Sequence, residues 1–327
     1  LTHRAFVLAL LARERTVVSR PLRAEDTDLF LAALAALGCT CETVGDGVEI
    51  VPPSVFPATA DLFCGNAGTM FRFLVAIAAA LPGTFRIDGV ARLRERPVRP
   101  LTEALQRLGV VIDFEEQEGH APLVVRGGRL PGGKVRLDAS ASSQYLSALL
   151  LAGQRAASAL EIEAPELTSA PYVGLTLDMI ERFGGRVDVA GGNRWIAHPS
   201  PLRATEVEIE ADCSAAAYPA AAAALSGGTV RIDALAESSR QGDRRRFDLL
   251  SGREFESVAL RDARDDQPQL EQCLARADAI AVTRRERQVR EARTLRDLFG
   301  LEARGIEGLR VGPQVREAVH GVHRHTD

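Results

Sequence analysis

The sequence predicts an α/β protein built from a repeated stretch of strand, turn, helix and strand. Segments such as 84–88 alternate apolar and polar residues, as strands with one buried and one exposed face do. Segment 73–81 is a short apolar run of the kind found in buried helices. The pattern returns at intervals of about seventy residues, which indicates one supersecondary element used several times. Helices and sheets should therefore pack in layers.

The first helix start, residues 65–72, carries the strongest functional signal. It reads GNAGTMFR, so glycines and other small residues stand where a strand runs into the apolar helix. Such a start exposes free N–H groups and the positive end of the helix dipole. It therefore favours binding of an anion.

Later segments repeat this design. Residues 140–144 (SASSQ) and 212–215 (DCSA) each precede an apolar helix. The strands behind the helices repeat as well, because 83–89 (GTFRIDG) resembles 228–234 (GTVRIDA), with a weaker copy at 160–164. We thus expect several copies of one strand, helix and strand.

Length and composition limit the class of protein. The 327 residues are enough for two domains, and 46% hydrophobic with 26% charged residues is ordinary for a globular protein. The net charge of −4 gives no overall attraction to nucleic acid. No apolar run is long enough for a bilayer, and no secretion signal is recognisable. We therefore expect a cytoplasmic protein.

The cysteines and lysines add two expectations. An odd number of cysteines without paired zinc spacings predicts buried free thiols in a reducing compartment. The cysteines are Cys39, Cys41, Cys64, Cys213 and Cys273. Lys134 is the sole lysine, so arginine supplies the other basic positions, which matters wherever chemistry needs a titratable amine.

Three arginines follow the first repeated strand. Arg92, Arg94 and Arg96 alternate with other residues before Pro97, so an extended run would point them to the same side. A charge run of this kind is either a solvated surface or a binding site for carboxylate or phosphate. The neighbouring helix start favours the binding site.

Hydroxyl side chains mark two further helix starts. Ser142 and Ser143 precede Gln144 at one of them, where an ordinary N-cap would need a single serine. Ser169 and Tyr172 precede a helix expected over 173–183, with Pro171 at a favoured early position. Three helix starts that face one cleft would hold a phosphorylated, hydroxyl-rich small molecule.

Together these motifs resemble the 5-enolpyruvylshikimate-3-phosphate (EPSP) synthases of the enolpyruvyl transferase family. The matching segments are 2–9, 23–28, 65–72, 92–97, 142–145, 169–172, 212–218 and 241–243, and they occur in family order. The sibling family that acts on UDP-N-acetylglucosamine carries a cysteine where residues 89–92 here have none, so the resemblance to it is weaker.

The resemblance implies a fold. It is a two-domain inside-out α/β barrel of repeated βαβαββ units, with pseudo-threefold symmetry in each domain. Residues 1–209 would form a complete three-unit substrate-binding domain, and residues 210–327 a partial second domain that lacks its first strand and last unit. The chain would then be truncated at both ends relative to the family.

The resemblance also implies a reaction and its residues. The enolpyruvyl group of phosphoenolpyruvate passes to the 5-hydroxyl of shikimate 3-phosphate and phosphate leaves, without metal or organic cofactor. The positions matching shikimate 3-phosphate ligands are Arg4, Ser142, Ser143, Gln144, Ser169 and Tyr172. Those matching phosphoenolpyruvate ligands are Gly68, Thr69, Arg92, Gln144, Arg287 and Arg324. The catalytic acid–base candidates are Asp278 and Glu286.

The match weakens toward the C-terminus. The family's catalytic Asp corresponds either to Asp278 or to segment 267–269, where no carboxylate is present, and Val322 replaces an Asp beside Arg324. The family's functional lysines have no counterpart, since Lys134 lies in a turn. Two alternatives therefore stand beside an active monomeric enzyme: a homologue that binds shikimate 3-phosphate without turnover, and transfer to another phosphorylated cyclic alcohol.

Overall fold

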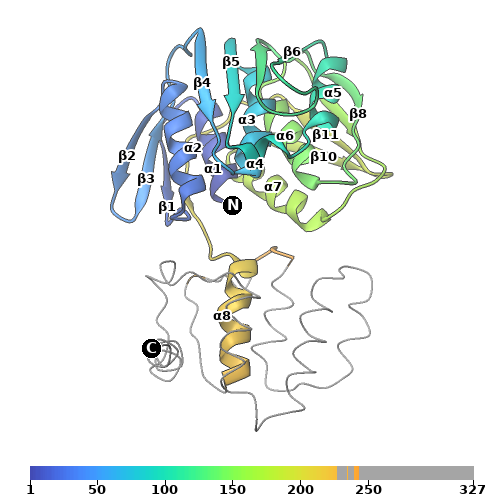
Figure 1. Cartoon of the computed structure of the whole chain (residues 1–327). Helices are drawn as coiled ribbons and strands as arrows, with labels where there is room; N and C mark the ends of the chain where they lie inside the picture. Colours follow the sequence, from blue (N-terminus) through green and yellow to red (C-terminus); the bar gives the residue numbers. More distant parts are fainter. Residues whose placement is uncertain (227–233, 235–238, 243–327) are drawn as a thin grey trace, which may run out of the picture. The chain divides into compact units, whose positions relative to one another are not determined.

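The computed structural model describes residues 1–226, 234 and 239–242 (Figure 1). The chain divides into two compact units. Unit 1 comprises residues 1–210 and 240–242, and unit 2 comprises residues 211–239 and 243–327. The described part of unit 2 contains helix α8 (Cys213–Ser226). All other described helices and strands belong to unit 1.

The described strands form three sheets of four strands each, and the three share one topology. The orders are β4-β5-β7-β6, β8-β9-β11-β10 and β12-β1-β3-β2, with each strand's neighbours in corresponding places. The first sheet contains β4 (Thr59–Phe63), β5 (Gly83–Asp88), β6 (Val111–Phe114) and β7 (Leu123–Gly127). The second contains β8 (Gly133–Arg136), β9 (Leu160–Glu163), β10 (Arg186–Ala190) and β11 (Arg194–His198). The third contains β1 (Thr16–Ser19), β2 (Thr40–Val44), β3 (Gly47–Val51) and β12 (Glu206–Glu208).

In each sheet the first two strands are parallel and the others antiparallel. A helix precedes the second strand of each sheet. In the first two sheets this helix is the crossover that parallel neighbours need, whereas in the third sheet the parallel partner β12 comes from the far end of unit 1. These helices are α1 (Thr2–Leu11) before β1, α3 (Gly68–Ala80) before β5 and α6 (Ser143–Gly153) before β9. The remaining helices of unit 1 are α2 (Glu25–Ala36), α4 (Ala91–Arg94), α5 (Arg99–Arg107) and α7 (Ala170–Arg182). The predicted helix and following strand are confirmed for two copies, α3 with β5 and α6 with β9, and the helix of the third copy is α8. The strand predicted at 228–234 in the third copy lies outside the described residues apart from residue 234.

The third sheet is completed from the far end of unit 1. Strand β12 lies parallel to β1, with Val207 opposite Val18. Both valines are buried. Without β12, strand β1 would be an open sheet edge that exposes backbone N–H and C=O groups. The chain therefore returns after some 190 residues to supply a strand to its first sheet.

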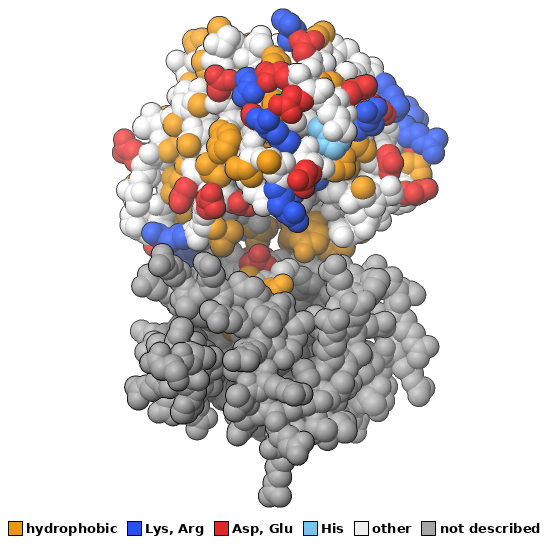
Figure 2. All heavy atoms as spheres, in the orientation of Figure 1, with side chains coloured by type: hydrophobic (Ala, Val, Ile, Leu, Met, Phe, Trp, Pro, Cys, Tyr) orange, Lys and Arg blue, Asp and Glu red, His pale blue; other side chains and the backbone are white. Residues whose placement is uncertain are grey.

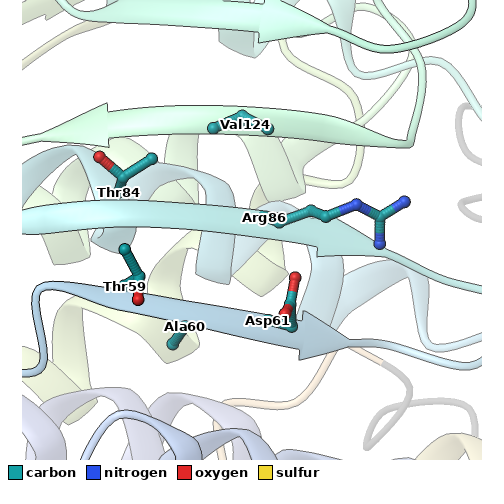
Figure 3. Close-up of a pocket in the computed structure, with 6 residues that line it drawn as sticks. All are labelled: Thr59, Ala60, Asp61, Thr84, Arg86 and Val124. Carbon is teal, nitrogen blue, oxygen red and sulfur yellow. The ribbon is translucent and has the colours of Figure 1, made fainter.

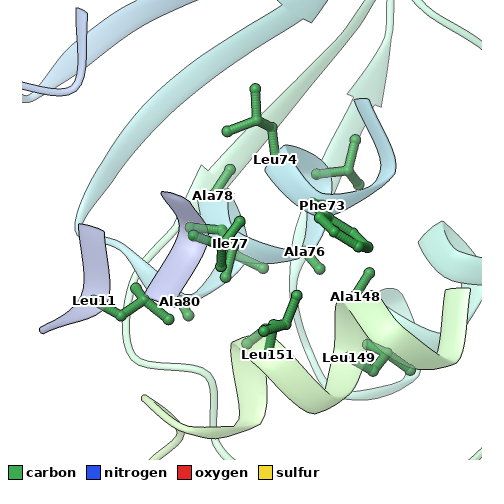
Figure 4. Packing of buried hydrophobic residues seen from close by; sticks show 14 of the residues in the cluster. Leu11, Phe73, Leu74, Ala76, Ile77, Ala78, Ala80, Ala148, Leu149 and Leu151 are labelled. Atoms are coloured by element: carbon green, nitrogen blue, oxygen red, sulfur yellow. The ribbon is translucent and has the colours of Figure 1, made fainter. Parts of the chain in front are cut away.

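The core lies among α1, α3 and α6, which Figure 1 shows between the sheets. Nearly every residue of α3 and α6 is buried, so both helices are apolar all round rather than on one stripe. Figure 4 shows Phe73 and Ile77 of α3 beside Ala148 and Leu151 of α6. The strands show the predicted alternation, since Leu160 and Ile162 of β9 are buried between less buried glutamates.

Two expectations are corrected. The run 92–96 is not extended, because residues 91–94 form the short helix α4. Val90, the residue just before this helix, is in an extended conformation. Arg92 and Arg96 therefore do not share a face with Arg94, which bonds Asp88 through Nε at 2.9 Å and Nη2 at 2.7 Å. The second correction concerns α7, which begins at Ala170 rather than at residue 173. Pro171 fits in its first turn, because the backbone N–H that proline lacks would have no helical partner there.

Several other expectations can be compared with the described residues. Cys39 and Cys64 are buried free thiols, Cys41 is a partly buried free thiol, and Cys213 is buried. Cys273 lies outside the described residues. No described helix combines the length and the apolar character needed to cross a bilayer. Within the same residues, no cluster of His, Cys, Asp or Glu side chains is placed to hold a metal ion.

Because α6 packs in the centre of unit 1, we expect Leu149→Ala to lower the free energy of unfolding by about 2–5 kcal/mol, through lost apolar burial and the cavity left behind. Urea denaturation of the full chain measures this change. The matched control is Leu22→Ala, since Leu22 is 51% exposed and should change stability by less than about 0.5 kcal/mol. Equal losses for the two variants would contradict this placement of the core.

His3 should make stability depend on pH. Its ring packs against Phe30 with centroids 5.1 Å apart, and burial, together with the nearby charges of the N-terminal amine and Arg4, lowers the pKa of His3 to about 4. In the unfolded chain His3 binds a proton below about pH 6.5, whereas in the folded chain it stays neutral down to about pH 4. The free energy of unfolding therefore falls by about 3 kcal/mol in total as the pH drops from 6.5 to about 4. Denaturation of wild type and His3→Gln across this range should show a flatter profile for the variant; parallel profiles would refute the assignment.

Candidate functional site

The candidate site lies where the first turns of α1, α3, α6 and α7 meet in unit 1. Arg72 in α3 donates from Nη1 to Oε1 of Gln144 in α6 at 2.7 Å. Its guanidinium also lies over the ring of Tyr145, 5.3 Å from the centroid. The tyrosine hydroxyl donates to the carbonyl of Pro97 at 2.9 Å. These contacts join the starts of two equivalent helices to the segment that follows α4.

Arg4 joins α1 to the other helices. Its Nε donates to Oγ1 of Thr176 at 2.7 Å, and its Nη2 donates to the carbonyl of Tyr172 at 3.1 Å. The guanidinium lies over the ring of Phe73 in α3, 5.5 Å from the centroid. Thr176 in turn lies 2.9 Å from the hydroxyl of Ser147 in α6. Arg4 thus contacts α3 and α7 from the first turn of α1.

Arg4 is a buried charge. It is 6% exposed and makes no ion pair with the residues that the structure describes. Burial lowers the pKa of its guanidinium to about 10, so it remains charged at neutral pH. A buried cation is costly unless an anion compensates it. The arrangement therefore suits a negatively charged ligand.

The serines predicted at helix starts lie where expected along the chain. Ser142 caps α6, because its Oγ accepts the Gln144 N–H at 3.2 Å. Ser143 is buried in the first turn of α6. Ser169 precedes α7 with φ near +54°, a left-handed conformation rare outside glycine. Tyr172, in the first turn of α7, has 43% of its surface exposed.

Gly68 and Thr69 open α3, and Gly68 is closely surrounded. A Cβ at Gly68 would lie 2.7 Å from Nη1 of Arg96 and 3.2 Å from Nη1 of Arg72. A side chain at this position would therefore displace the guanidinium group of Arg96 from the helix start. Arg96 belongs to the arginine run that the sequence favoured as an anion site, although it was not among the residues assigned to phosphoenolpyruvate, and Arg72 lies inside the predicted motif 65–72 without having been predicted as a site residue.

Not every predicted residue takes part in the contacts described above. Arg92 is exposed on α4 and has no hydrogen bond or ion pair to any described residue. The four remaining predicted residues lie outside the described residues. They are Asp278, Glu286, Arg287 and Arg324.

A groove on the outer face of the first sheet is separate from this site. It has a volume of about 470 Å³, and Figure 3 shows its lining on β4, β5 and β7. Its arginine, Arg86, is already paired with Glu115 and Asp88 at 2.8 and 3.2 Å. On the face of unit 1 seen in Figure 2, basic and acidic side chains are interspersed. The outer sheet surface is therefore electrostatically balanced, unlike the site.

Comparisons with known proteins agree with this arrangement. The family model described as EPSP synthase (3-phosphoshikimate 1-carboxyvinyltransferase) matches residues 1–260. Proteins named 3-phosphoshikimate 1-carboxyvinyltransferase from Syntrophobacter fumaroxidans and Laribacter hongkongensis are each 41% identical, over 76% and 77% of this chain. The solved EPSP synthase of Acinetobacter baumannii aligns with a TM-score of 0.61 and 26% identity, covering 72% of this chain and 54% of that one.

The chain spans about 60% of the length of the two curated relatives. The family match nevertheless extends over all of unit 1, including its three sheets and the helix starts at Arg4, Gly68 and Gln144. By sequence and by fold, the chain belongs to the EPSP synthase family.

Proposed function

We propose that the chain transfers the enolpyruvyl group of phosphoenolpyruvate to the 5-hydroxyl of shikimate 3-phosphate and releases phosphate, a step of the shikimate pathway. The observation that carries the proposal is Arg4, a buried guanidinium without an ionic partner among the described residues, at the meeting point of four helix starts. A phosphorylated ligand supplies the missing negative charge.

Shikimate 3-phosphate binds at α1, α6 and α7 in this proposal. Hydroxyl groups and backbone N–H groups suit its phosphate and ring hydroxyls. The residues assigned to it are Arg4, Ser142, Ser143, Gln144, Ser169 and Tyr172. Arg4 joins α1 to α7 through Thr176 and the carbonyl of Tyr172, which supports a shared binding surface at these two helices.

Phosphoenolpyruvate binds beside it, at the start of α3. Gly68 and Thr69 offer backbone N–H groups, Gln144 serves both ligands, and Arg92, Arg287 and Arg324 add cationic groups. The 5-hydroxyl adds to C2 of the enol while a proton adds to C3, and phosphate then leaves as a proton is removed from C3. Asp278 and Glu286 move these protons, and the reaction proceeds in a cytoplasmic monomer without nucleic acid or membrane.

A second candidate is binding of shikimate 3-phosphate without turnover. It is favoured because the functional lysines of the family have no counterpart in this chain. The sole lysine is Lys134, whose Nζ pairs with Oε1 of Glu161 at 3.0 Å across β8 and β9. This lysine is on the outer sheet and takes no part in the candidate site.

One experiment separates the two candidates. The full chain is titrated with shikimate 3-phosphate, with and without phosphoenolpyruvate, and phosphate release is followed. Saturable binding with phosphate release supports the enzyme, and saturable binding without release supports the second candidate. Absence of shikimate 3-phosphate binding would contradict both candidate functions.

For Arg92→Ala we expect weaker binding of phosphoenolpyruvate by about 1.5–3 kcal/mol, the range for a hydrogen bond to a charged group. Binding of shikimate 3-phosphate should stay nearly unchanged. Calorimetric titration of each ligand measures both effects. Arg107→Ala is the matched control, since Arg107 is exposed and pairs with Glu103 on the same helix. An equal loss for both ligands would show that Arg92 is wrongly assigned.

Thr176→Val should remove one of the hydrogen bonds that hold the guanidinium group of Arg4 in place. The variant keeps the side-chain shape but removes the hydroxyl that accepts from Arg4, so we expect a loss of about 1–3 kcal/mol in unfolding free energy and weaker binding of shikimate 3-phosphate. Denaturation and ligand titration of the full chain test this. The same change at Thr59, which is exposed on β4, should alter neither measurement. Unchanged ligand affinity in Thr176→Val would exclude a role for Arg4 in binding.

A further inference from the structure

A short segment from much later in the chain packs against α7. Residues 240–242 belong to unit 1, although the residues before and after them belong to unit 2. Nη1 of Arg240 donates to Oδ1 of Asp178 at 2.7 Å. A Cβ at Gly242 would lie 3.0 Å from Cβ and 3.1 Å from Cγ of Pro171. The backbone of residue 242 therefore lies directly against the first turn of α7.

The two contacts fall on one face of α7. Pro171 and Asp178 are seven residues apart in the helix, which is about two turns, so their side chains point the same way. Thr176 points to a different side, where it bonds Arg4 and lies beside Ser147 of α6. Helix α7 is thus held by Arg4 on one side and by residues 240–242 on another.

The ion pair is partly shielded from water. The Arg240 side chain is 71% exposed, but that of Asp178 is 23% exposed. An ion pair is stronger where one partner is withdrawn from bulk water, because the effective dielectric constant is lower there. Arg240 is also the cation that Asp178 pairs with among the residues that the structure describes. This contact is therefore what fixes the segment beside the helix at its far end.

The beginning of α7 needs such support. Ser169, just before the helix, has φ near +54°, an unfavourable conformation that persists where surrounding contacts hold it. Among the described residues its side chain makes no hydrogen bond that caps α7. The geometry of Ser169 and Tyr172, both assigned above to shikimate 3-phosphate, thus depends on the contacts that hold the rest of the helix.

We propose that Arg240 is a positioning residue for shikimate 3-phosphate. Its ion pair with Asp178 docks residues 240–242 on α7, and this docking holds Ser169 and Tyr172 in the geometry that binds the ligand. The inference rests on the proposed function. Arg240 acts through α7 and does not touch the ligand.

Docking of residues 240–242 and ligand binding then depend on each other. Two events that are coupled in this way strengthen each other by the same factor. Loss of the ion pair should weaken binding of shikimate 3-phosphate, and bound ligand should hold the segment more firmly on α7. An exposed ion pair without this role would do neither.

The binding test is a double-mutant cycle in the full chain. It compares Arg240→Gln, Asp178→Asn and the variant that combines them, by calorimetric titration with shikimate 3-phosphate. We expect each single change to raise the Kd about three- to fivefold. The combined variant should lose no more than either single variant, because both changes remove the same contact. Arg240→Lys keeps the charge and should retain most of the wild-type affinity.

Glu181→Gln is the matched control for Asp178→Asn. Glu181 is exposed on the same helix, and the change removes the same charge. Its Kd should differ from that of wild type by less than about 1.5-fold. The melting temperature of the ligand-free chain should stay nearly constant in all variants, since exposed ion pairs add little to global stability.

Limited digestion with trypsin measures the docking directly. Cleavage after Arg240 requires the segment to leave α7 and enter the protease, so its rate reports how often the segment is undocked. We expect Asp178→Asn to be cut there about three- to fivefold faster than wild type or Glu181→Gln, as peptide masses show. Shikimate 3-phosphate should slow this cut in wild type more than in Asp178→Asn.

Several results would overturn the inference while leaving the proposed function in place. They are an unchanged Kd in both single variants, losses that add in the combined variant, an equal loss in Glu181→Gln, and equal rates of cleavage after Arg240 in wild type and Asp178→Asn. A loss of affinity that is matched by a lower melting temperature overturns it too, because Arg240 would then merely stabilise unit 1. A wild-type chain that does not bind shikimate 3-phosphate overturns both the inference and the proposed function.

Discussion

The site depends on parallel pairing of the first two strands in each sheet. Parallel neighbours cannot be joined by a tight turn, so α3 joins β4 to β5 and α6 joins β8 to β9. Helix α1 stands at the same place before β1, whose parallel partner β12 is supplied from the far end of unit 1. Since the sheets share one topology, α1, α3 and α6 occupy equivalent places and pack against one another with their first turns together. Arg4 and Gln144 are in those first turns, and Arg72 lies one turn into α3. The backbone arrangement alone therefore brings the positive ends of these helices to one place, whatever side chains they carry.

Much of this could be predicted from the sequence because its signals are local. Alternation identified β5 and β9, small residues before apolar runs identified α3 and α6, and the return of the pattern identified the repeat. The pairing of β12 with β1 could not be predicted in the same way, because it joins segments far apart in the chain and three-residue strands carry little pattern. The ends of helices were the least certain feature, as the earlier start of α7 shows.

The arginine run shows where local pattern fails. Alternation at Arg92, Arg94 and Arg96 is compatible with a strand, but a short helix is stabilised here by Asp88, at the end of β5. Partial burial disfavours the charged form of Asp88, yet hydrogen bonds from Arg94 and from the N–H of Gly89 outweigh it, so the pKa of Asp88 is lowered. The charged carboxylate holds the side chain of Arg94. This outcome depends on a contact between strand and helix that spacing alone does not contain.

Arginines in unit 1 fall into two groups, and the difference points to function. On the outer sheets Arg86 and Arg186 pair with carboxylates, so the surface charges balance, and exposed ion pairs of this kind contribute little to stability. At the helix starts Arg4, Arg72 and Arg96 contact hydroxyl, amide or backbone groups but no carboxylate among the described residues. A protein selected for stability alone would place acidic residues beside them, as it does elsewhere in the same unit. Their omission leaves charge for a ligand to neutralise, so binding and local stability oppose each other here.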